Sequence, residues 1–418
     1  MAEVLPVQAL HYDLDRVGSL ADVVAPPYDV IDDDQRAELV SRSPHNVVEL
    51  DLPRDPNGGD PYEHSAALLA EWTDDGVLTS DSDPQIWALE QDYTAPDGSR
   101  LTRRGFLARV KLAQYGEGVR PHERTQPGPK EDRLRLTRAT RHNLSPIFAL
   151  HPGNAWQHLE PELGDEPWGE VTDSDGTTHR VWRIGDPAVH QAIAAELEPG
   201  ELLIADGHHR YETSLAYQQE VGPGGDADYV LMALVSLEDP GLTVFPTHRL
   251  ISGLADDPDK QEALGTGLKE IFDVEQVPAD ELDPGGAEGV GVFGYMDSHF
   301  ERSFRLRLRD TARLDEALAG RSDAYRTLDA AILEELVLKG ILGMSTDDIA
   351  AKCGIGYTPH IGEVLKKLGS GDYQAAFVLR PTPVDQVRAV AAAGETMPPK
   401  STYFFPKLLT GIAFNPLG

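Results

Sequence analysis

The chain has 418 residues, with 37 basic and 70 acidic side chains, and its formal net charge at pH 7 is −33. A surface of that sign repels the phosphate backbone of nucleic acids and anionic lipids, so we expect neither nucleic acid nor a membrane as a partner. Because Cys353 is the only cysteine and no apolar run reaches the roughly 18 residues of a membrane span, we expect a reduced, cytoplasmic protein without a disulfide or a thiolate metal cluster.

The length predicts two domains, because a single hydrophobic core stops growing at roughly 250 to 300 residues. Hydrophobic residues make up 40% of the chain and charged residues 26%, which is typical of globular proteins. We place the boundary near Gly253, ahead of the acidic residues at 256–259. This division gives a first domain of residues 1–253 and a second of residues 254–418.

The first domain is predicted to begin with alternating strands and helices. Strands are expected at residues 5–10 and 46–52, and helices at residues 33–41 and 61–76. Residues 84–94 and 101–112 are predicted as two antiparallel strands joined by a turn at Pro96-Asp97-Gly98. A polar, proline-rich loop over residues 119–133 then leads into a basic helix that ends near residue 142.

The later segments complete an α+β pattern. A strand at residues 146–150 and a helix at residues 187–197 precede a buried strand, a glycine turn and an amphipathic helix over residues 201–217, and a strand follows at residues 229–237. In the second domain we expect strands at residues 289–296, 302–308 and 375–379 and a helix at residues 328–338. The predicted fold class is therefore α+β in both domains.

The junction of strand and helix at Asp206-Gly207-His208-His209-Arg210 is the strongest functional signal in the sequence. The start of a helix attracts anions, because the peptide dipoles leave partial positive charge there. The glycine lets the backbone approach a ligand closely, and an arginine can hold phosphate oxygens with two hydrogen bonds. This pattern predicts a phosphate site.

Two other interpretations of this junction remain open. Asp206 is a suitable helix cap, with the histidines and Arg210 as surface or core residues. Alternatively, His208 and His209 contribute to a metal site, although adjacent histidines point in different directions and no metal-binding spacing accompanies them. A metal-dependent hydrolase would need His122 and His248 to join them.

Further candidate residues lie outside this junction. The loop at residues 119–133 contains His122, Glu123, Arg124 and Lys130, with Glu123 as a candidate base and the others as phosphate contacts, although a solvated surface loop has the same composition. Asp29 is either a catalytic carboxylate or a turn residue. The pair of His248 and Arg249 follows a Pro-Thr turn, where the two residues either contact the ligand or end a strand.

Four blocks of the sequence together resemble a known bacterial family, which is catalogued as domain of unknown function 1015. The blocks are Val24-Ala-Pro-Pro-Tyr-Asp-Val30, Arg120-Pro-His-Glu-Arg-Thr125, residues 206–213 and Met397-Pro-Pro-Lys-Ser-Thr-Tyr403. The Asp-Gly-His-His-Arg core also resembles the signature loop of the ParB and sulfiredoxin superfamily, which includes free-serine kinases. Sulfiredoxin chemistry needs a cysteine in this loop, where the present chain has histidine, and the net charge of −33 disfavours DNA binding.

The superfamily resemblance implies a ParB/sulfiredoxin-like nucleotide-binding core followed by a second α+β domain. It assigns Gly207, His208, His209 and Arg210 to phosphate contacts and Asp206 to a magnesium ion or to orienting the loop. Together with Glu123, Asp206, His209 and Asp29 as catalytic candidates, it predicts a kinase that uses ATP or ADP with Mg²⁺ to phosphorylate a small molecule, such as free serine. The alternative is a regulatory module that binds or hydrolyses a nucleotide without a metabolite acceptor. The sequence leaves the oligomeric state open.

Overall fold

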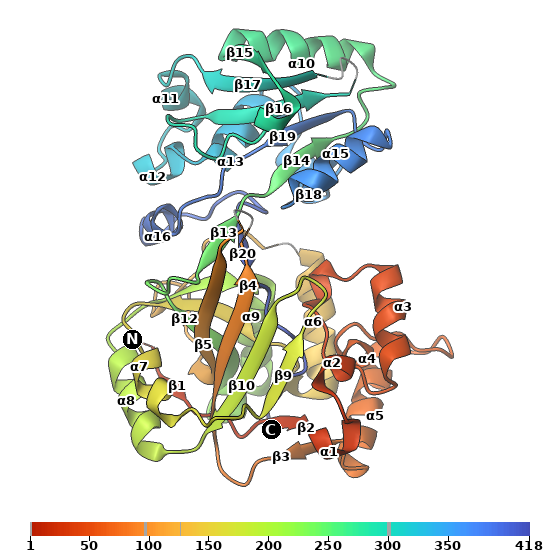
Figure 1. Cartoon of the computed structure of the whole chain (residues 1–418), viewed down its shortest axis with the longest axis vertical. Coiled ribbons are helices and arrows are strands. Elements are labelled where there is room, and N and C mark those ends of the chain that lie inside the picture. Colours follow the sequence, from red (N-terminus) through yellow and green to blue (C-terminus); the bar gives the residue numbers. More distant parts are fainter. Residues whose placement is uncertain (1, 96–97, 126, 299–301) are drawn as a thin grey trace. The chain divides into compact units, whose positions relative to one another are not determined.

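The structure is a computed structural model that describes residues 2–95, 98–125, 127–298 and 302–418. The chain forms two compact units (Figure 1). The first contains residues 1–121, 125–243 and 406–418, and the second contains residues 122–124 and 244–405. The prediction placed a single boundary near Gly253. In the structure the first unit ends before that boundary, at residue 243, and residues 122–124 belong to the second unit. The last 13 residues, which the prediction assigned to the second domain, belong to the first unit.

A nine-stranded mixed sheet organises the first unit. Its strand order is β6-β11-β8-β12-β5-β4-β10-β9, and β1 also pairs with β5. The pairs β8–β12 and β6–β11 are parallel, and the other pairs are antiparallel. The strands are β1 (Val4–Leu5), β4 (Ile86–Thr94), β5 (Arg100–Lys111), β6 (Val119–Arg120), β8 (Ile147–His151), β9 (Gly169–Thr172), β10 (Thr178–Ile184), β11 (Leu202–Asp206) and β12 (Tyr229–Ser236).

Alternate side chains of these strands face the main core of the first unit, because successive residues of a strand point to opposite faces. Buried members of this core from the sheet include Ala88, Phe106 and Leu234. Helices α7 (Trp156–Leu159), α8 (Pro187–Leu197) and α9 (His208–Val221) supply the apolar side chains opposite them, including Ile193 and Leu215. The sheet and α9 therefore share one hydrophobic core.

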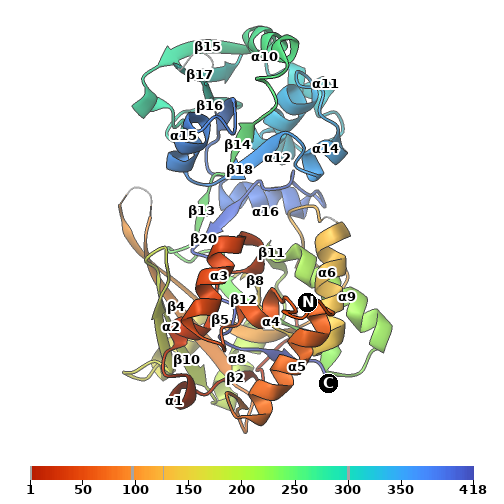
Figure 2. The same cartoon turned by 90° about the vertical axis from the view of Figure 1, so that its right-hand side faces the viewer.

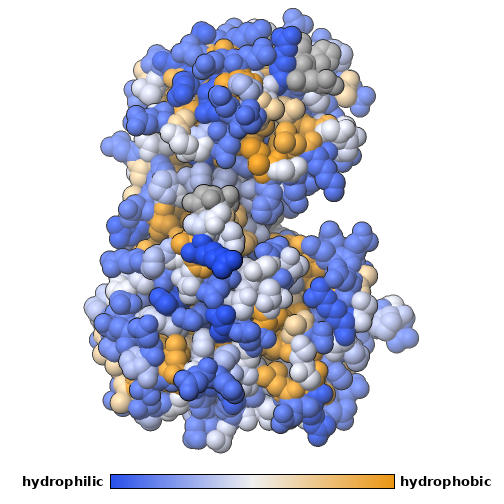
Figure 3. Space-filling model, in the orientation of Figure 1, coloured by the Kyte–Doolittle hydropathy of each residue, from blue (hydrophilic) through white to orange (hydrophobic). Residues whose placement is uncertain are grey.

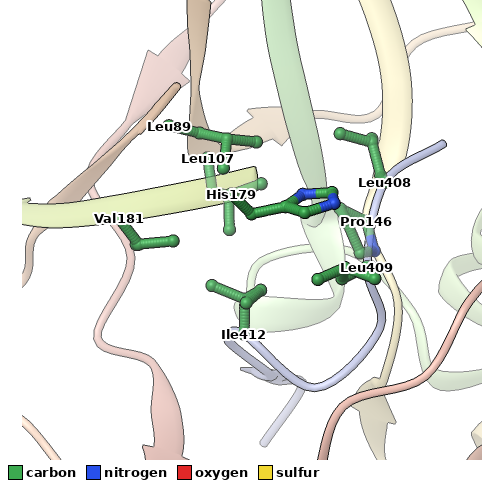
Figure 4. A pocket seen from close by; sticks show the side chains of 8 residues that line it. All are labelled: Leu89, Leu107, Pro146, His179, Val181, Leu408, Leu409 and Ile412. Atoms are coloured by element: carbon green, nitrogen blue, oxygen red, sulfur yellow. The ribbon is translucent and has the colours of Figure 1, made fainter. Parts of the chain in front are cut away.

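The C-terminal segment packs on the opposite face of the same sheet. Leu408, Leu409 and Ile412 lie across from sheet residues that include Leu89 and Leu107, around an apolar pocket of about 280 Å³ (Figure 4). Short backbone pairings tie this segment to the rest of the first unit, since residue 410 pairs with residue 25, residue 414 with residue 10, and β21 (Asn415–Pro416) with β7 (His142–Asn143). The last residues of the chain thus form part of this unit.

Further helices of the first unit pack beside the sheet (Figure 2). The pairs α4–α5, α5–α6 and α6–α9 are in contact. The remaining elements are β2 (Leu10–Tyr12), β3 (Leu78–Ser80), α1 (Leu14–Val17), α2 (Leu20–Val23), α3 (Asp33–Arg42), α4 (Val48–Asp51), α5 (Pro61–Asp74), α6 (Pro127–Thr140) and the 3₁₀ helices Tyr28–Val30, Glu160–Glu162 and Asp226–Asp228.

The second unit is built on a six-stranded antiparallel sheet with the order β15-β17-β16-β19-β14-β18. Its strands are β14 (His248–Ile251), β15 (Phe272–Val277), β16 (Val292–Asp297), β17 (Arg302–Leu308), β18 (Ile355–Thr358) and β19 (Ala375–Val378), while β13 (Thr243–Phe245) and β20 (Tyr403–Phe405) form a separate pair. Its helices are α10 (Pro258–Ile271), α11 (Arg313–Ala317), α12 (Asp323–Arg326), α13 (Asp329–Ile332), α14 (Thr346–Ala350), α15 (Ile361–Gly369), α16 (Val384–Ala392), the 3₁₀ helix Ala279–Glu281 and the π-helix Leu333–Lys339.

The predicted mixture of helices and strands is confirmed, including the helix over residues 61–76, the strands on both sides of residue 97, and the strand, glycine turn and helix at residues 201–217. The predicted strand at residues 46–52 is wrong, because this segment forms α4. The buried side chain of Asn46 accepts a hydrogen bond from the Val48 amide and donates to the carbonyls of Asp22 and Val24, which fixes a helical turn against the strand preference of the two valines. The predicted turn residues Pro96 and Asp97 lie outside the described residues.

Hydrophilic residues cover most of the face shown in Figure 3, and apolar patches are scattered between them. This pattern agrees with the large excess of acidic residues. Among the helices that the described residues form, none combines the length and the apolar character needed to cross a lipid bilayer.

We expect the Phe414→Ala substitution to lower the free energy of unfolding of the first unit by about 3 to 5 kcal/mol, because it opens a cavity between the C-terminal segment and β2. Phe414 is fully buried, and its ring centroid lies 6.1 Å from that of Tyr12. Tryptophan fluorescence during urea unfolding reports on this unit, since all 5 tryptophans belong to it. Val221→Ala is the control, because Val221 is 55% exposed; an equal loss in both variants would contradict the packing role of the segment.

Candidate functional site

The turn between β11 and α9 has the geometry that the phosphate-site prediction requires. Gly207 adopts a left-handed conformation, with φ 94° and ψ 27°, and the 14-residue helix α9 begins at the next residue. No side chain caps this helix at Gly207. A residue with a Cβ atom is strained in this conformation, and the added atom would lie about 3.0 Å from the Arg210 guanidinium. The turn therefore requires glycine, and the positive end of a long helix lies directly after it.

A lysine from the C-terminal segment lies at this turn. Lys407 Nζ is 2.8 Å from Asp206 Oδ2, at the end of β11. The Lys407 carbonyl accepts a hydrogen bond from the Gln91 side-chain amide at 3.0 Å, so both ends of this residue are held. Gln91 is itself 1% exposed and belongs to the central strand β4. Lys407 thus adds a fixed ammonium group next to the start of α9.

A second cation, Arg103, is buried close to the same turn. Its Nε donates to Gln91 Oε1 at 2.9 Å, and its guanidinium lies 4.6 Å from the centroid of the Phe148 ring. Phe148 is the direct β8 partner of Asp206 on β11. Burial lowers the pKa of Arg103 to about 9, so the side chain stays protonated at pH 7. Its buried Nη1 has no hydrogen-bond partner within the described part of the chain.

Burying an arginine without a carboxylate partner is costly, because desolvation of the charge is not repaid by an ion pair. Tyr93, Asp239 and Asp206 act on Arg103 through their charges, in that order, but the group that is hydrogen-bonded to it is the neutral Gln91 amide. An anion bound at the start of α9 would supply the missing compensation. The cation therefore fits an anionic group, such as a nucleotide phosphate, at this turn.

A histidine continues the network behind Gln91. His179 Nδ1 lies 3.1 Å from the Gln91 amide nitrogen, and its Nε2 lies 2.9 Å from Asp173 Oδ2. The consistent arrangement is that Gln91 donates to Nδ1 and Nε2–H donates to the carboxylate. His179 also lines the apolar pocket formed with Leu408 (Figure 4). Gln91 on β4 is thus held by side chains from both neighbouring strands, Arg103 on β5 and His179 on β10.

Arg210, in the first turn of α9, contacts a second group of residues in the first unit. It donates a hydrogen bond to the Pro146 carbonyl and lines a recess of about 390 Å³ with Asp51 and Arg133. Burial raises the pKa of Asp51, and the charges of Arg133 and Arg210 oppose this rise. Arg133 Nη1 is 3.1 Å from Asp51 Oδ1. Arg210 thus lies close to the buried charges of Asp51 and Arg133. The prediction of a phosphate contact did not anticipate this position.

Asp29 belongs to the surroundings of this cluster. It lies in the 3₁₀ helix Tyr28–Val30, and the Arg133 guanidinium lies 4.1 Å from the centroid of the Tyr28 ring. Burial, followed by the charge of Asp29, raises the pKa of Tyr28 to about 12, while Arg133 and Arg210 act in the opposite direction. Two residues predicted independently, Asp29 and Arg210, therefore lie within the same electrostatic neighbourhood.

The other predicted residues of the first unit lie on α9 or contact it. His208 is 7% exposed, and His209 and Arg210 are half-buried. Lys130, on α6, forms an ion pair with Glu212 at 2.9 Å, and Thr125 donates a hydrogen bond to the same carboxylate at 2.8 Å. Lys130 therefore pairs with a residue that lies one helical turn after the start of α9, where the anion is proposed to bind.

Five predicted site residues belong to the second unit instead. They are His122, Glu123, Arg124, His248 and Arg249. The Glu123 carboxylate accepts a hydrogen bond from the Lys400 amide, and Arg124 Nη2 lies 3.4 Å from the buried Glu334, in the π-helix. Residues adjacent in the predicted loop are thus divided, because Thr125 and Lys130 remain in the first unit.

His248 and Arg249 are buried at the start of β14. The backbone amide of Leu379 donates to His248 Nδ1 at 3.2 Å, and Arg249 donates to the Thr247 carbonyl and lies 4.8 Å from the centroid of the Tyr357 ring. Burial, together with the charges of Arg249 and His360, lowers the pKa of His248 to about 4. The ring is therefore neutral at pH 7, and its Nδ1 accepts the hydrogen bond of the Leu379 backbone amide.

The residues around Asp206 do not form a magnesium site by themselves. The Lys407 ammonium already pairs with its carboxylate, and no three His, Cys, Asp or Glu residues of the described ranges are grouped as metal ligands. Mg²⁺ prefers near-octahedral oxygen coordination, which one lysine-paired carboxylate does not provide. We therefore derive no step through a metal. The histidines predicted for a hydrolase are divided as well, with His208 and His209 in the first unit and His122 and His248 in the second.

Sequence reasoning missed Arg103, Gln91 and Lys407. A signal for Arg103 was present, because Arg103 and Arg104 are consecutive in a strand and must point to opposite faces of a sheet that is covered on both sides. One of the two is thus forced inward. Lys407 offered no local signal, because 201 residues separate it from Asp206 and only the return of the C-terminal segment brings the two together.

The mixed sheet of the first unit, the antiparallel sheet of the second and the glycine turn at the start of α9 define a protein of mixed helices and strands with a candidate anion site. The chain belongs to the family described as protein of unknown function (DUF1015), whose model matches residues 4–331. The predicted membership of this family is confirmed. No curated protein matches the chain in sequence.

Several solved structures are similar to the chain at low identity. A conserved hypothetical protein from Pyrococcus furiosus has a TM-score of 0.38 and 14% identity, over 73% of this chain and 95% of the other. A mutant free serine kinase in complex with AMP has the same TM-score and identity, over 73% and 92%. SbnI from Staphylococcus aureus, with a C-terminal truncation, has a TM-score of 0.37 and 11% identity, over 73% and 85%. Likeness of this size carries no argument about ligands or reactions.

We expect His248 to make the second unit less stable in acid. Its pKa falls from 6.5 in the unfolded chain to about 4 in the fold, so the unfolded state binds the proton first as the pH drops. Stability should therefore fall between pH 6.5 and pH 4, by up to about 3 kcal/mol, and level off below pH 4.

Calorimetric unfolding of the parent chain and of His248→Asn across this pH range measures the effect. Asparagine offers an oxygen to the Leu379 amide but does not titrate. The difference in stability between the two proteins should change with pH only over this window. A difference that is the same at every pH would show that His248 is not held neutral.

Proposed function

We propose that the chain is a nucleotide-dependent kinase of a small molecule, with ATP or ADP as the phosphoryl donor and a free amino acid such as serine as the acceptor. The observation that carries the proposal is the left-handed Gly207 turn at the start of α9, with the Lys407 ammonium and the buried Arg103 guanidinium beside it. A polyphosphate carries several negative charges, and catalysis of its transfer depends mainly on fixed positive groups around it.

The proposed division of roles follows from the contacts. The start of α9 and its His208 and His209 bind phosphate oxygens, and Lys407 neutralises charge there while Asp206 holds its ammonium in place. Arg103 contributes a positive potential from beneath the turn rather than a direct contact, since its side chain is fully buried.

Phosphoryl transfer also needs a group that receives a proton from the acceptor hydroxyl. We propose Asp29 as this base, with Arg210 and Tyr28 near it. The hydroxyl oxygen bonds to the terminal phosphorus, the bond from that phosphorus to the bridging oxygen breaks, and the hydroxyl proton moves to the carboxylate. The nucleotide leaves with one phosphate fewer.

The Lys407→Ala variant should bind ATP and ADP more weakly by about 1.5 to 3 kcal/mol, which is the scale of a hydrogen bond to a charged group. Isothermal titration calorimetry at fixed salt measures the change in Kd. Arg138→Ala is the matched control, because Arg138 forms an exposed ion pair with Glu220 near the far end of α9. Equal affinities for the parent chain and the Lys407 variant would remove the lysine from the site.

The Asp29→Asn variant should keep nucleotide affinity and lose transfer, with kcat lower by about 10² to 10⁴, the usual contribution of a general base. Phosphorus NMR of reactions with ATP or ADP and serine detects the phosphorylated acceptor directly. Alanine replaces serine as the control, since it has no hydroxyl. Binding of nucleotide without transfer to any tested amino acid would instead favour a regulatory nucleotide-binding module.

A further inference from the structure

The first unit contains another recess, of about 270 Å³, at the end of β8 that is remote from Asp206. Phe148, near the start of this strand, pairs with Asp206, whereas His151, its last residue, lines the recess. The other lining residues include Phe106, Trp156, Ser236 and Asp239. Small-molecule sites typically measure roughly 300 to 1,000 Å³, so this recess is large enough only for a ligand at the small end of that class.

Aromatic rings form the inner part of this recess. Phe106, His151 and Trp156 are 1%, 2% and 8% exposed, and the ring centroids of Phe106 and His151 lie 6.1 Å apart. Aromatic faces attract cations, because the π electrons give the face of a ring a negative potential. The inner wall thus favours an apolar or a positively charged ligand.

Most polar groups of the recess are hydrogen-bond acceptors, and Trp156 Nε1–H is a buried donor without a partner among the described residues. His151 Nδ1 donates to the Pro152 carbonyl at 2.9 Å, and burial lowers the pKa of the ring, so the neutral ring presents Nε2 as an acceptor. The Ser236 hydroxyl uses its proton on the Gly153 carbonyl. The carboxylates of Glu160, Glu238 and Asp239 complete the lining.

One cation also lines the recess, and a carboxylate behind it balances its charge. Arg104 Nε is 2.9 Å from Glu90 Oε1. The lining itself holds three carboxylates and no basic side chain besides Arg104, although the buried Arg103 also acts on Asp239. The recess therefore combines an aromatic wall, several acceptors and an excess of negative charge.

We propose that this recess binds a small organic amine in its protonated form. An ammonium group brings only donors and one positive charge, and these match the His151 acceptor, the carboxylates and the aromatic faces. A metal ion fits less well, since no three ligands of the described residues are grouped to hold one. The recess lies at the His151 end of β8, whereas Asp206 pairs with Phe148 near the start of that strand, so the amine proposal does not depend on the kinase proposal.

Isothermal titration calorimetry with 1,4-diaminobutane tests the proposal, with 1,4-butanediol as the uncharged probe of equal length and salt held at a physiological level. We expect saturable binding of the diamine at one site and none of the diol. Asp239→Asn should weaken diamine binding about tenfold, while the substituted side chain still accepts the hydrogen bond from the Gly241 amide. His151→Gln should weaken it as well.

Glu131→Gln is the control for attraction to a chain of net charge −33, because Glu131 is an exposed carboxylate on α6 outside the recess. Its affinity for the diamine should equal that of the parent chain. Tryptophan fluorescence confirms that each variant is folded. Absence of diamine binding, equal binding of the diol, or equal losses in the Glu131 and Asp239 variants would each overturn the proposal.

Discussion

The side chain of Gln91 connects the parts of the first unit that make up the candidate site. Its oxygen accepts from Arg103 on β5, and its amide group contacts His179 on β10 and the Lys407 carbonyl on the returning C-terminal segment. An amide can serve three elements at once because it has donors and an acceptor on one planar group. Buried hydrogen-bond networks of this kind restrict the arrangement of their members, so the position of Lys407 next to Asp206 depends on Gln91.

The cost of this arrangement is concentrated in Arg103. A buried guanidinium bonded to a neutral amide is less favourable than an apolar side chain of similar volume, and its lowered pKa reflects that penalty. Proteins retain such groups where function uses the charge. In a chain with a net charge of −33, an anionic ligand also needs local cations, because the average surface potential repels it. The positive groups of Arg103 and Lys407 near one turn make the local potential positive there.

The two proposed sites of the first unit use opposite ends of one sheet for opposite kinds of ligand. At the Asp206 end of the β8–β11 pair, a helix begins and cations gather, which suits phosphates. At the His151 end, acceptors and aromatic rings gather, which suits an amine. The rigid sheet between them fixes both sets of side chains through the alternation of residues in its strands.

Local patterns in the sequence were sufficient for the glycine turn at Gly207, the helix that follows it and the strands on both sides, because left-handed backbone, helix starts and alternation depend on near neighbours. They failed at residues 46–52, where the tertiary contacts of Asn46 override the strand preference of its neighbours. The tertiary structure alone placed Lys407 at Asp206, directed Arg210 toward Asp51, and divided Glu123 from Lys130 between the two units. These outcomes depend on how segments that are distant in the sequence pack against each other. Short-range sequence patterns do not encode such contacts. Asp206 and Lys407, for example, are 201 positions apart.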